Sequence, residues 1–539
     1  LGALGVLPKG LTMGGANSSS IALDYSGAGI ELASLTSETS DFVLAMDGKA
    51  YRDKKVVIET SGKIDTGQRS LSLAPLHIDS VTGVIALERF SIGDWGAAGN
   101  TLSGSGQARF DIDTVLDVVA DWYVLPPDVS TTGIVELTMA GAPAGDGQMS
   151  YDIAAELRNF SLAGRGAQIF SDETARIVLD GTREPSTGAT EFNRLAINTP
   201  LIELTAAGFV RPMEEGGEEF AISGELGMDL ARIGALVRGF SELDLVMAGG
   251  GARPFTLRGI MSEDQRTQWW NHIDVSGAVQ ADVVKIMGLE LSGLEIPIAI
   301  SGGLARADVQ GTINQGTLAV QPLLDMRNEP PLLTIPEGRV ISDMQLTREV
   351  AESFLARIHP LFMGAGQMSG AVDLSFERFY WPLGDDNTDK RQFSGRIDLA
   401  EVQLQSSAML GTLLQTLGAQ NSSLDLSGEQ IRFAATDGRI TTTPLTTNLS
   451  DTDLIVSGSM GFDTSLDYLV QAEVTQALVG AEVYQYLRGT VIRVPIGGTL
   501  ANPDISVQTV QRAATDLVNQ AARQRLQEEA GKLLEGLFN

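Results

Sequence analysis

The chain has no cysteine among its 539 residues, only three histidines, and few aromatic side chains. Without thiols it can form neither disulfides nor zinc–thiolate sites, and it has no thiol nucleophile. It also has no run of about 18 apolar residues, so no transmembrane helix is predicted within it. Because the first residue is Leu1 and not methionine, we expect a processed chain or a piece of a longer one, with any signal or anchor upstream.

Basic residues are scarce: 38 lysines and arginines face 68 aspartates and glutamates, which gives a net charge of −30. We therefore expect no nucleic-acid partner, since phosphate groups must be neutralised by cationic side chains. Adhesion to an anionic membrane surface is disfavoured for the same reason. Hydrophobic residues make up 43% of the chain, enough to build a core, so a mainly disordered protein is excluded.

Short alternation of apolar and polar side chains dominates the sequence. In the run from Leu466 to Val474 every second side chain is apolar, and only Leu469 breaks the alternation. This period of two is typical of strands with one buried face. Similar runs cover Ile21–Tyr25, Val56–Ile64, Ile153–Leu162, Ile298–Val309 and Ile397–Leu404. Strands recurring about every 8–12 residues predict a mainly β protein with antiparallel pairing.

Helical periodicity is confined to a few segments. The spacing of apolar residues predicts helices over Asp113–Trp122, Asp229–Val237, Thr347–Ile358, Met409–Leu417 and Thr509–Phe538. The last of these has one apolar stripe and a polar face of mixed charge, and is therefore an amphipathic helix. We expect it to pack over the last strands and cover a sheet edge; binding a membrane or a partner helix is the alternative.

Several segments repeat at irregular spacing. Gly145–Ser150 is echoed by Gly364–Ser369, and both lead into an alternating run. Two further pairs are Gly316–Leu323 with Gly438–Leu445, and Leu304–Val309 with Leu500–Ile505. The irregular spacing indicates divergent structural units. We place an N-terminal β-repeat region at 1–255, a middle one at 256–345, a C-terminal β region at 346–507 and a terminal helix at 508–539.

The segment from Leu346 to Val507 carries an ordered set of motifs. A predicted helix ends at Ile358-His359-Pro360-Leu361, a strand follows Gly366-Gln367-Met368-Ser369, and the segment closes with Val494-Pro495-Ile496-Gly497-Gly498-Thr499-Leu500-Ala501-Asn502-Pro503. This order resembles the C-terminal region of AsmA-like proteins, the AsmA/TamB-type envelope proteins. The closing Pro-Ile-x-Gly-Thr-Leu-x-x-Pro pattern carries one extra glycine here.

The resemblance implies an elongated, strongly curved antiparallel sheet whose inner face is a taco-like apolar groove. It implies a non-enzymatic, periplasmic envelope protein that holds lipid acyl chains for transport between membranes or outer-membrane assembly. A membrane anchor outside this chain, envelope protein partners and no cofactor belong to the same expectation. Two alternatives stay open: a closed sandwich, which needs the same alternation, and a structural envelope, appendage or surface-layer component without cargo.

The alternation also selects candidate groove residues in three neighbouring predicted strands. Antiparallel pairing places their apolar side chains on one side of the sheet, which we predict to be the lipid-binding side. The candidates are Leu454, Val456, Leu466, Tyr468, Val470, Ala472, Val474, Ile492, Val494 and Ile496.

Residues able to carry chemistry form no catalytic pattern. His77, His272 and His359 have no metal-ligand spacing and are predicted to be structural; His359 precedes Pro360 at a helix end, where a protonated ring favours the dipole. Ser103-Gly104-Ser105-Gly106 lies in a strand-turn context and does not form a nucleophile elbow. Gly364–Gly370 leads into a strand, not a helix, and so fails the dinucleotide fingerprint.

Three acidic or aromatic features remain. Asp385, Asn387 and Asp389 offer oxygens at alternate positions, as calcium loops do, but Lys390 follows where such loops need glycine, so a solvated turn is favoured. Glu214–Glu219 is predicted to be a hairpin tip. For Trp269-Trp270 we expect one buried and one exposed ring, with contact to a groove end or a partner as the alternative.

Overall fold

The computed structural model describes residues 12–505, except for 27–28, 47–48, 94–100, 119–128, 146, 165–166, 215, 241–243, 364–366, 406–422, 450–451, 475 and 477–479. Beyond 505 it describes 515–516, 519, 522–523 and 526–527. The described strands form one sheet of 31 strands whose described pairings are antiparallel. The predicted mainly β fold is thereby confirmed. No helix within the described residues is long and apolar enough to cross a bilayer.

Residue contacts divide the chain into two units. Unit 1 comprises 1–243, 247–278 and 300–302, and unit 2 comprises 244–246, 279–299 and 303–539. The predicted boundaries near 255 and 345 fall inside unit 1 and unit 2, respectively.

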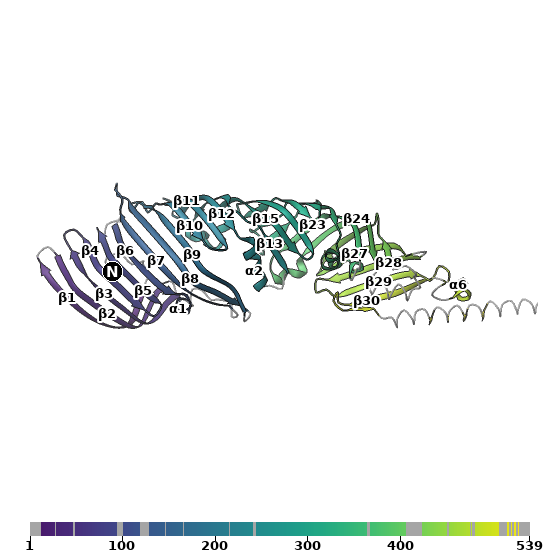
Figure 1. Ribbon diagram of the computed structural model, residues 1–539, viewed down its shortest axis with the longest axis horizontal. Helices are drawn as coiled ribbons and strands as arrows, with labels where there is room; N and C mark the ends of the chain where they lie inside the picture. Colours follow the sequence, from purple (N-terminus) through teal and green to yellow (C-terminus); the bar gives the residue numbers. More distant parts are fainter. Residues whose placement is uncertain are drawn as a thin grey trace, which may run out of the picture. The chain divides into compact units, whose positions relative to one another are not determined.

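Unit 1 is a succession of antiparallel strands in which each strand from β1 to β12 pairs with the next along the chain, as Figure 1 shows from β1 to β9. Its strands are β1 (Thr12–Ser26), β2 (Gly29–Met46), β3 (Lys49–Asp65), β4 (Ser70–Ser80), β5 (Gly83–Gly93), β6 (Thr101–Asp111), β7 (Val129–Pro143), β8 (Met149–Gly164), β9 (Ala167–Arg183), β10 (Thr190–Asn198), β11 (Ile202–Pro212), β12 (Glu218–Met228) and β14 (Arg253–Met261). Its helices are α1 (Ile112–Val118), α2 (Leu230–Phe240) and the 3-10 helix η2 (Glu263–His272). The division between the units runs through β13 (Leu245–Ala248), β15 (Ile273–Ile286) and β16 (Leu289–Ser301).

Unit 2 contains the remaining strands and most of the buried core. Its strands are β17 (Leu304–Ala307), β18 (Val309–Ile313), β19 (Gly316–Val320), β20 (Leu323–Asp325), β21 (Leu332–Thr334), β22 (Gly338–Gln345), β23 (Met368–Pro382), β24 (Gln392–Gln405), β25 (Ser423–Asp425), β26 (Gln430–Thr436), β27 (Arg439–Leu449), β28 (Thr452–Gly461), β29 (Leu466–Glu473), β30 (Val491–Gly498) and β31 (Pro503–Ile505). Its helical segments are α3 (Arg348–Ser353), α6 (Ala481–Leu487) and the 3-10 turns η3 (Leu355–Arg357), η4 (Pro360–Phe362) and η5 (Asp385–Lys390).

The predicted strands are found, with one difference. The run Ile298–Val309 is not one strand, because Gly302 and Gly303 take positive φ angles of 55° and 77° and turn the chain between β16 and β17. The last residues of the two repeated segments open strands: Met149-Ser150 begins β8 and Met368-Ser369 begins β23.

Three of the five predicted helices can be compared with described elements. Asp229–Val237 is found as α2, and Asp113–Trp122 is found as α1 up to Val118, with the rest outside the described residues. Thr347–Ile358 splits into α3 and η3 at Phe354. Met409–Leu417 lies outside the described residues, as does most of the predicted C-terminal helix; its described positions are helical and exposed.

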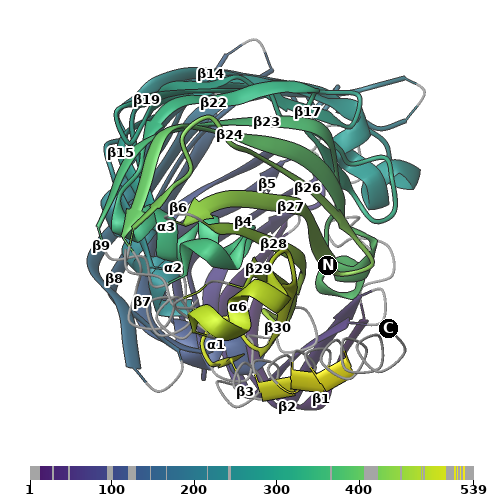
Figure 2. The same cartoon turned by 90° about the vertical axis from the view of Figure 1, so that its right-hand side faces the viewer.

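The core of unit 2 is formed by one sheet face closed by helical turns. The Thr347 side chain caps α3 by accepting a hydrogen bond from the backbone N–H of Val350, 3.2 Å away. Val350, Leu355 and Phe362, at most 1% exposed, then pack into one cluster with the apolar side chains of β22–β30. Figure 2 shows α3 on the inner side of the arched strands β23 and β24. The apolar face of unit 2 is therefore a packed interior.

Candidate functional site

The apolar face of unit 1 is a continuous surface made by every second residue of β3–β12. The strand register aligns these residues in rows that cross all ten strands. One row is Thr60, Leu76, Leu87, Gly106, Met139, Ile153, Leu179, Leu195, Ala206 and Gly224. The next is Ile58, Ile78, Ile85, Ala108, Leu137, Ala155, Ile177, Ile197, Leu204 and Leu226. At about 4.8 Å per interstrand step, each row is roughly 40 Å long.

These rows are not packed into a closed core. Their leucines, isoleucines and methionine are half-buried except for Ile177, which exposes 44% of its surface. By contrast, the corresponding face of β29 in unit 2 is buried at every second position from Leu466 to Ala472. Unit 1 therefore presents a long apolar surface to which a ligand can gain access.

Glycines on this face let neighbouring strands approach closely. A Cβ atom added to Gly106 would lie 2.6 Å from the Cα atom of Leu87. One added to Gly62 would lie 2.9 Å from the Cα atom of Leu73. Both distances are shorter than real Cβ contacts, so a side chain at either position would force the strands apart. Because glycine has no side chain, the apolar face is recessed at these positions.

The opposite face of unit 1 is polar. Glu136 of β7 lies between two arginines: its carboxylate oxygens are 3.7 Å from Arg109 and 3.2 Å from Arg158. Arg158 also donates to Glu156 at 2.9 Å, and this hydrogen bond lowers the pKa of the Glu156 carboxyl. Such exposed pairs add little stability but keep this face hydrated.

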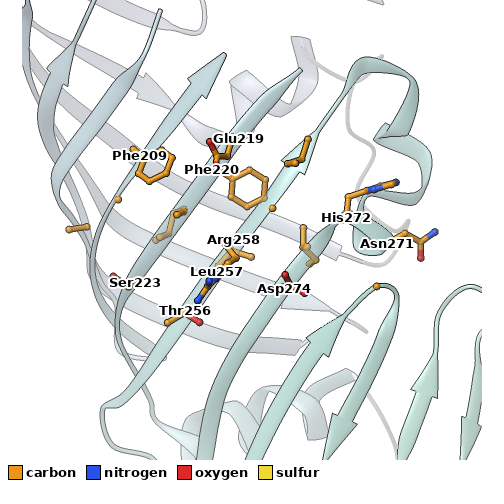
Figure 3. Close-up of a pocket in the computed structure, with 18 residues that line it drawn as sticks. Phe209, Glu219, Phe220, Ser223, Thr256, Leu257, Arg258, Asn271, His272 and Asp274 are labelled. Atoms are coloured by element: carbon orange, nitrogen blue, oxygen red, sulfur yellow. The ribbon is translucent and has the colours of Figure 1, made fainter. Parts of the chain in front are cut away.

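A hollow of about 990 Å³ lies across β11, β12, β14 and β15, within unit 1 (Figure 3). Residues of both faces line it, among them Phe209, Arg258 and Asp274 of the polar face and Phe220 and Leu257 of the apolar face. Arg258 lies opposite Asp274 in the register of β14 and β15. The mixture of aromatic and charged side chains in this open depression forms no recognisable catalytic arrangement among the described residues.

Nine of the ten candidate groove residues lie on one face of β28, β29 and β30, and Val474 follows directly after β29. Val456 faces Val470, and Val470 faces Val494 on the next strand. All ten are buried, with exposures of 1–9%, and belong to the closed core of unit 2. The set is Leu454, Val456, Leu466, Tyr468, Val470, Ala472, Val474, Ile492, Val494 and Ile496. In this structure they therefore form a packed interior, and the accessible apolar surface lies in unit 1, on strands outside the candidate set.

His359 links the helical turns to this core. Its Nδ1 atom accepts a hydrogen bond from the backbone N–H of Leu361 at 3.2 Å, and its ring meets that of Tyr468 edge-on at 5.6 Å. Complete burial lowers the pKa of His359 to about 3, and burial also raises the pKa of Tyr468. The expectation that a protonated His359 ring interacts favourably with the helix dipole is wrong, because the ring is neutral near pH 7. His359 is a structural residue, and its Nε2 atom has no described partner.

The other two histidines belong to unit 1. His77 is half-buried on the polar face of β4, between Glu59 and Ala86 of the neighbouring strands. His272 is exposed at the end of η2.

The acidic segments adopt ordinary turns. Asp385, Asn387 and Asp389 lie in η5, where the Asn387 Oδ1 atom accepts a hydrogen bond from the Lys390 ammonium at 2.9 Å. Within the described part of the chain, no three His, Asp or Glu side chains gather as metal ligands. Glu214 lies in the tip between β11 and β12, as predicted, whereas Glu218 and Glu219 already belong to β12.

The tryptophan pair lies in η2. Trp269 exposes 47% of its surface and meets Trp270 edge-on, with ring centroids 5.9 Å apart. Trp270 is half-buried, so it is more protected than Trp269 but not buried as expected. Ser103–Gly106 lies within β6, so no nucleophile elbow exists there.

The site and fold define a mainly β protein with one open apolar sheet face. Comparison with known proteins adds no family: no protein-family model matches the chain, and no curated protein matches it significantly. The resemblance to AsmA-like proteins therefore remains a hypothesis that rests on the motifs between Leu346 and Val507.

Proposed function

We propose that this chain is a non-enzymatic envelope protein that holds lipid acyl chains on the apolar face of unit 1, for lipid transport between membranes or outer-membrane assembly. The observation that carries the proposal is the pair of half-buried apolar rows crossing β3–β12. A periplasmic location, a membrane anchor outside the chain and envelope partners belong to the same proposal and come from the resemblance to AsmA-like proteins.

The size of the apolar face supports a long hydrocarbon ligand. Each buried methylene contributes about 0.8 kcal/mol, so a fully buried chain of about 16 carbons gains roughly 13 kcal/mol before the cost of ordering it. An extended chain of that length needs about 20 Å, half of one row. Such a ligand needs no specific polar partner, which agrees with a face of Leu, Ile, Val and Met.

The test compares two neighbouring substitutions on β9 that point to opposite faces. Leu179 belongs to the apolar face and Val178 to the polar face, and both are half-buried. We expect Leu179→Glu to remove co-purifying lipid, since a carboxylate disrupts the apolar row. Val178→Glu places the same charge one residue away and should keep the lipid.

The readouts are native mass spectrometry, lipid extraction and a thermal melt of each variant. Equal melting temperatures with lipid lost only from Leu179→Glu support the proposal. A wild-type chain that carries no lipid after mild purification, and takes up none from phospholipid vesicles, would refute it and favour a structural component without cargo.

A further inference from the structure

The apolar face of unit 2 is covered by a segment of its own chain, residues 347–362. These residues form α3 and the turns η3 and η4, between strands β22 and β23. The apolar side chains that the segment buries, with exposures of 0–8%, are Val350, Ala351, Leu355, Ala356, Ile358, Leu361 and Phe362. They belong to the same buried cluster as the ten candidate groove residues. We call residues 347–362 the plug, because they cover in unit 2 the kind of face that lies open in unit 1.

The plug is attached to the sheet by apolar contacts. Every hydrogen bond described for residues 347–362 joins two residues between 347 and 363. Among them are the bonds that the N–H groups of Val350 and Leu361 donate to Thr347 and His359. Within the part of the chain that the structure describes, the plug thus contacts the sheet as a bound hydrocarbon ligand would.

The plug has little secondary structure of its own. α3 has six residues, and η3 and η4 have three each. Isolated helices shorter than about 12 residues are marginal in water, so packing on the sheet holds these turns in place. One buried polar atom opposes this packing. The Nε2 atom of His359 has no described hydrogen-bond partner, and release of the plug hydrates it.

The combination of strand and helix that begins the plug occurs three times in the chain. Helices α1, α2 and α3 follow β6, β12 and β22 and begin at residues 112, 230 and 348, so each starts 118 residues after the one before. Ile112 of α1 and Ile233 and Leu236 of α2 are half-buried, whereas Val350 of α3 is fully buried. The same element therefore packs loosely in unit 1 and tightly in unit 2. An element with two such arrangements is suited to a switch.

We propose that the plug is an intrachain occupant of a second acyl site, and that a long hydrocarbon chain displaces it from the apolar face of unit 2. The ligand class is the one proposed for unit 1, so this inference rests on that proposed function. Exchange of one apolar occupant for another keeps the face covered, so it avoids the cost of exposing the candidate groove residues to water. Unit 2 is thus closed while it is empty and takes up a chain only in exchange for the plug.

A single thiol in the plug and one in the sheet measure the two openings separately, because the chain has no cysteine. Ala356 of the plug and Ala435 of β26 are 0% and 1% exposed and belong to the same cluster, so Ala356→Cys and Ala435→Cys are matched variants. Without denaturant, we expect a small disulfide reagent to label Ala356→Cys at least about tenfold faster than Ala435→Cys, because the plug opens without the sheet. Thermal melts check that both variants are folded. If Ala356→Cys does not fold, Ala351→Cys replaces it, since Ala351 is equally buried in the plug.

Dodecanoate, a soluble fatty acid, is the ligand probe. It should speed the labelling of Ala356→Cys by at least about fivefold and leave Ala435→Cys protected, because the acyl chain replaces the plug on the face. Butyrate is the control and should change neither rate, since its chain is too short to cover the face.

Equal labelling rates of the two thiols would overturn the proposal, because unit 2 would then open only as a whole. Slower or unchanged labelling of Ala356→Cys in dodecanoate would overturn it as well, because the plug would then be a permanent part of the core. Adding Leu179→Glu to Ala356→Cys separates this inference from the function proposed for unit 1. Faster labelling that persists in the double variant supports exchange in unit 2 even if unit 1 holds no lipid, whereas its loss would place the site in unit 1 alone and refute the exchange.

Discussion

The burial of His359 predicts that unit 2 loses stability in mild acid. The ordinary imidazole pKa of 6.5 falls to about 3 in the folded chain. As the pH drops below 6.5, the unfolded chain takes up a proton on His359, whereas the folded chain does not until about pH 3. The contribution is therefore complete above pH 6.5 and is lost as the pH falls towards 3.

The magnitude follows from the shift of the pKa. Each pH unit between the two pKa values changes the free energy of unfolding by about 1.4 kcal/mol. Between about pH 7 and pH 5, proton uptake by the unfolded state alone removes about 2 kcal/mol. This is a large fraction of a typical domain stability.

The assay needs a probe inside unit 2. Ser375 of β23 is buried, and its hydroxyl has no described hydrogen-bond partner, so Ser375→Cys is a nearly isosteric change that introduces the chain's one thiol. Pulse labelling of this thiol across a urea series gives the free energy of opening unit 2, with a disulfide reagent that reacts at both pH values. His359→Asn in the same background is the control, because Asn keeps an acceptor for the Leu361 N–H and does not titrate.

The carboxylates are the same in the His359 and His359→Asn chains, so the difference between their pH-dependent losses of stability reports on His359. The chain with His359 should lose about 2 kcal/mol more than the His359→Asn chain between pH 7 and pH 5. Equal losses in the two would mean that His359 is solvated or charged in the folded chain, and the reasoning from its burial would fail.

Two further predictions concern the same unit. Val470→Glu should destabilise unit 2 by several kcal/mol, whereas Gln471→Glu on the polar face should change its stability by less than about 1 kcal/mol. The same thiol labelling in the Ser375→Cys background measures both. A Val470→Glu chain with unchanged stability would show that this face is open. Thr347→Ala should cost about 1 kcal/mol and Thr347→Ser much less, because serine keeps the cap on the Val350 N–H; equal losses in urea titrations would exclude the cap as the cause.

The strands and their faces can be predicted from sequence because a period of two is a local property. The run from Leu466 to Val474 determines which side chains share a face, and β29 confirms that assignment. The break at Gly302-Gly303 does not show in this pattern, since Ile298–Val309 alternates on both sides of the turn. Two adjacent glycines are the available signal, because they tolerate the positive φ angles of a tight turn.

The accessibility of the faces cannot be predicted in the same way. The alternation from Ile153 to Leu162 lies on an open face, and that from Leu466 to Val474 lies in a closed core, yet both look alike in sequence. The difference depends on long-range packing: Val350 and Phe362 belong to a core that includes strands more than 100 residues away in sequence. The candidate groove residues share one face of their strands, and in unit 2 that face is buried.

An apolar face that is open to water favours aggregation unless other features keep the chain soluble and a ligand covers the face. Rows of half-buried leucine and isoleucine across ten strands would promote aggregation in an uncharged protein. Here the polar face, with Glu136 between Arg109 and Arg158, and a net charge of −30 oppose association. The same balance of charge and apolar surface thus leaves room for an acyl chain along β3–β12.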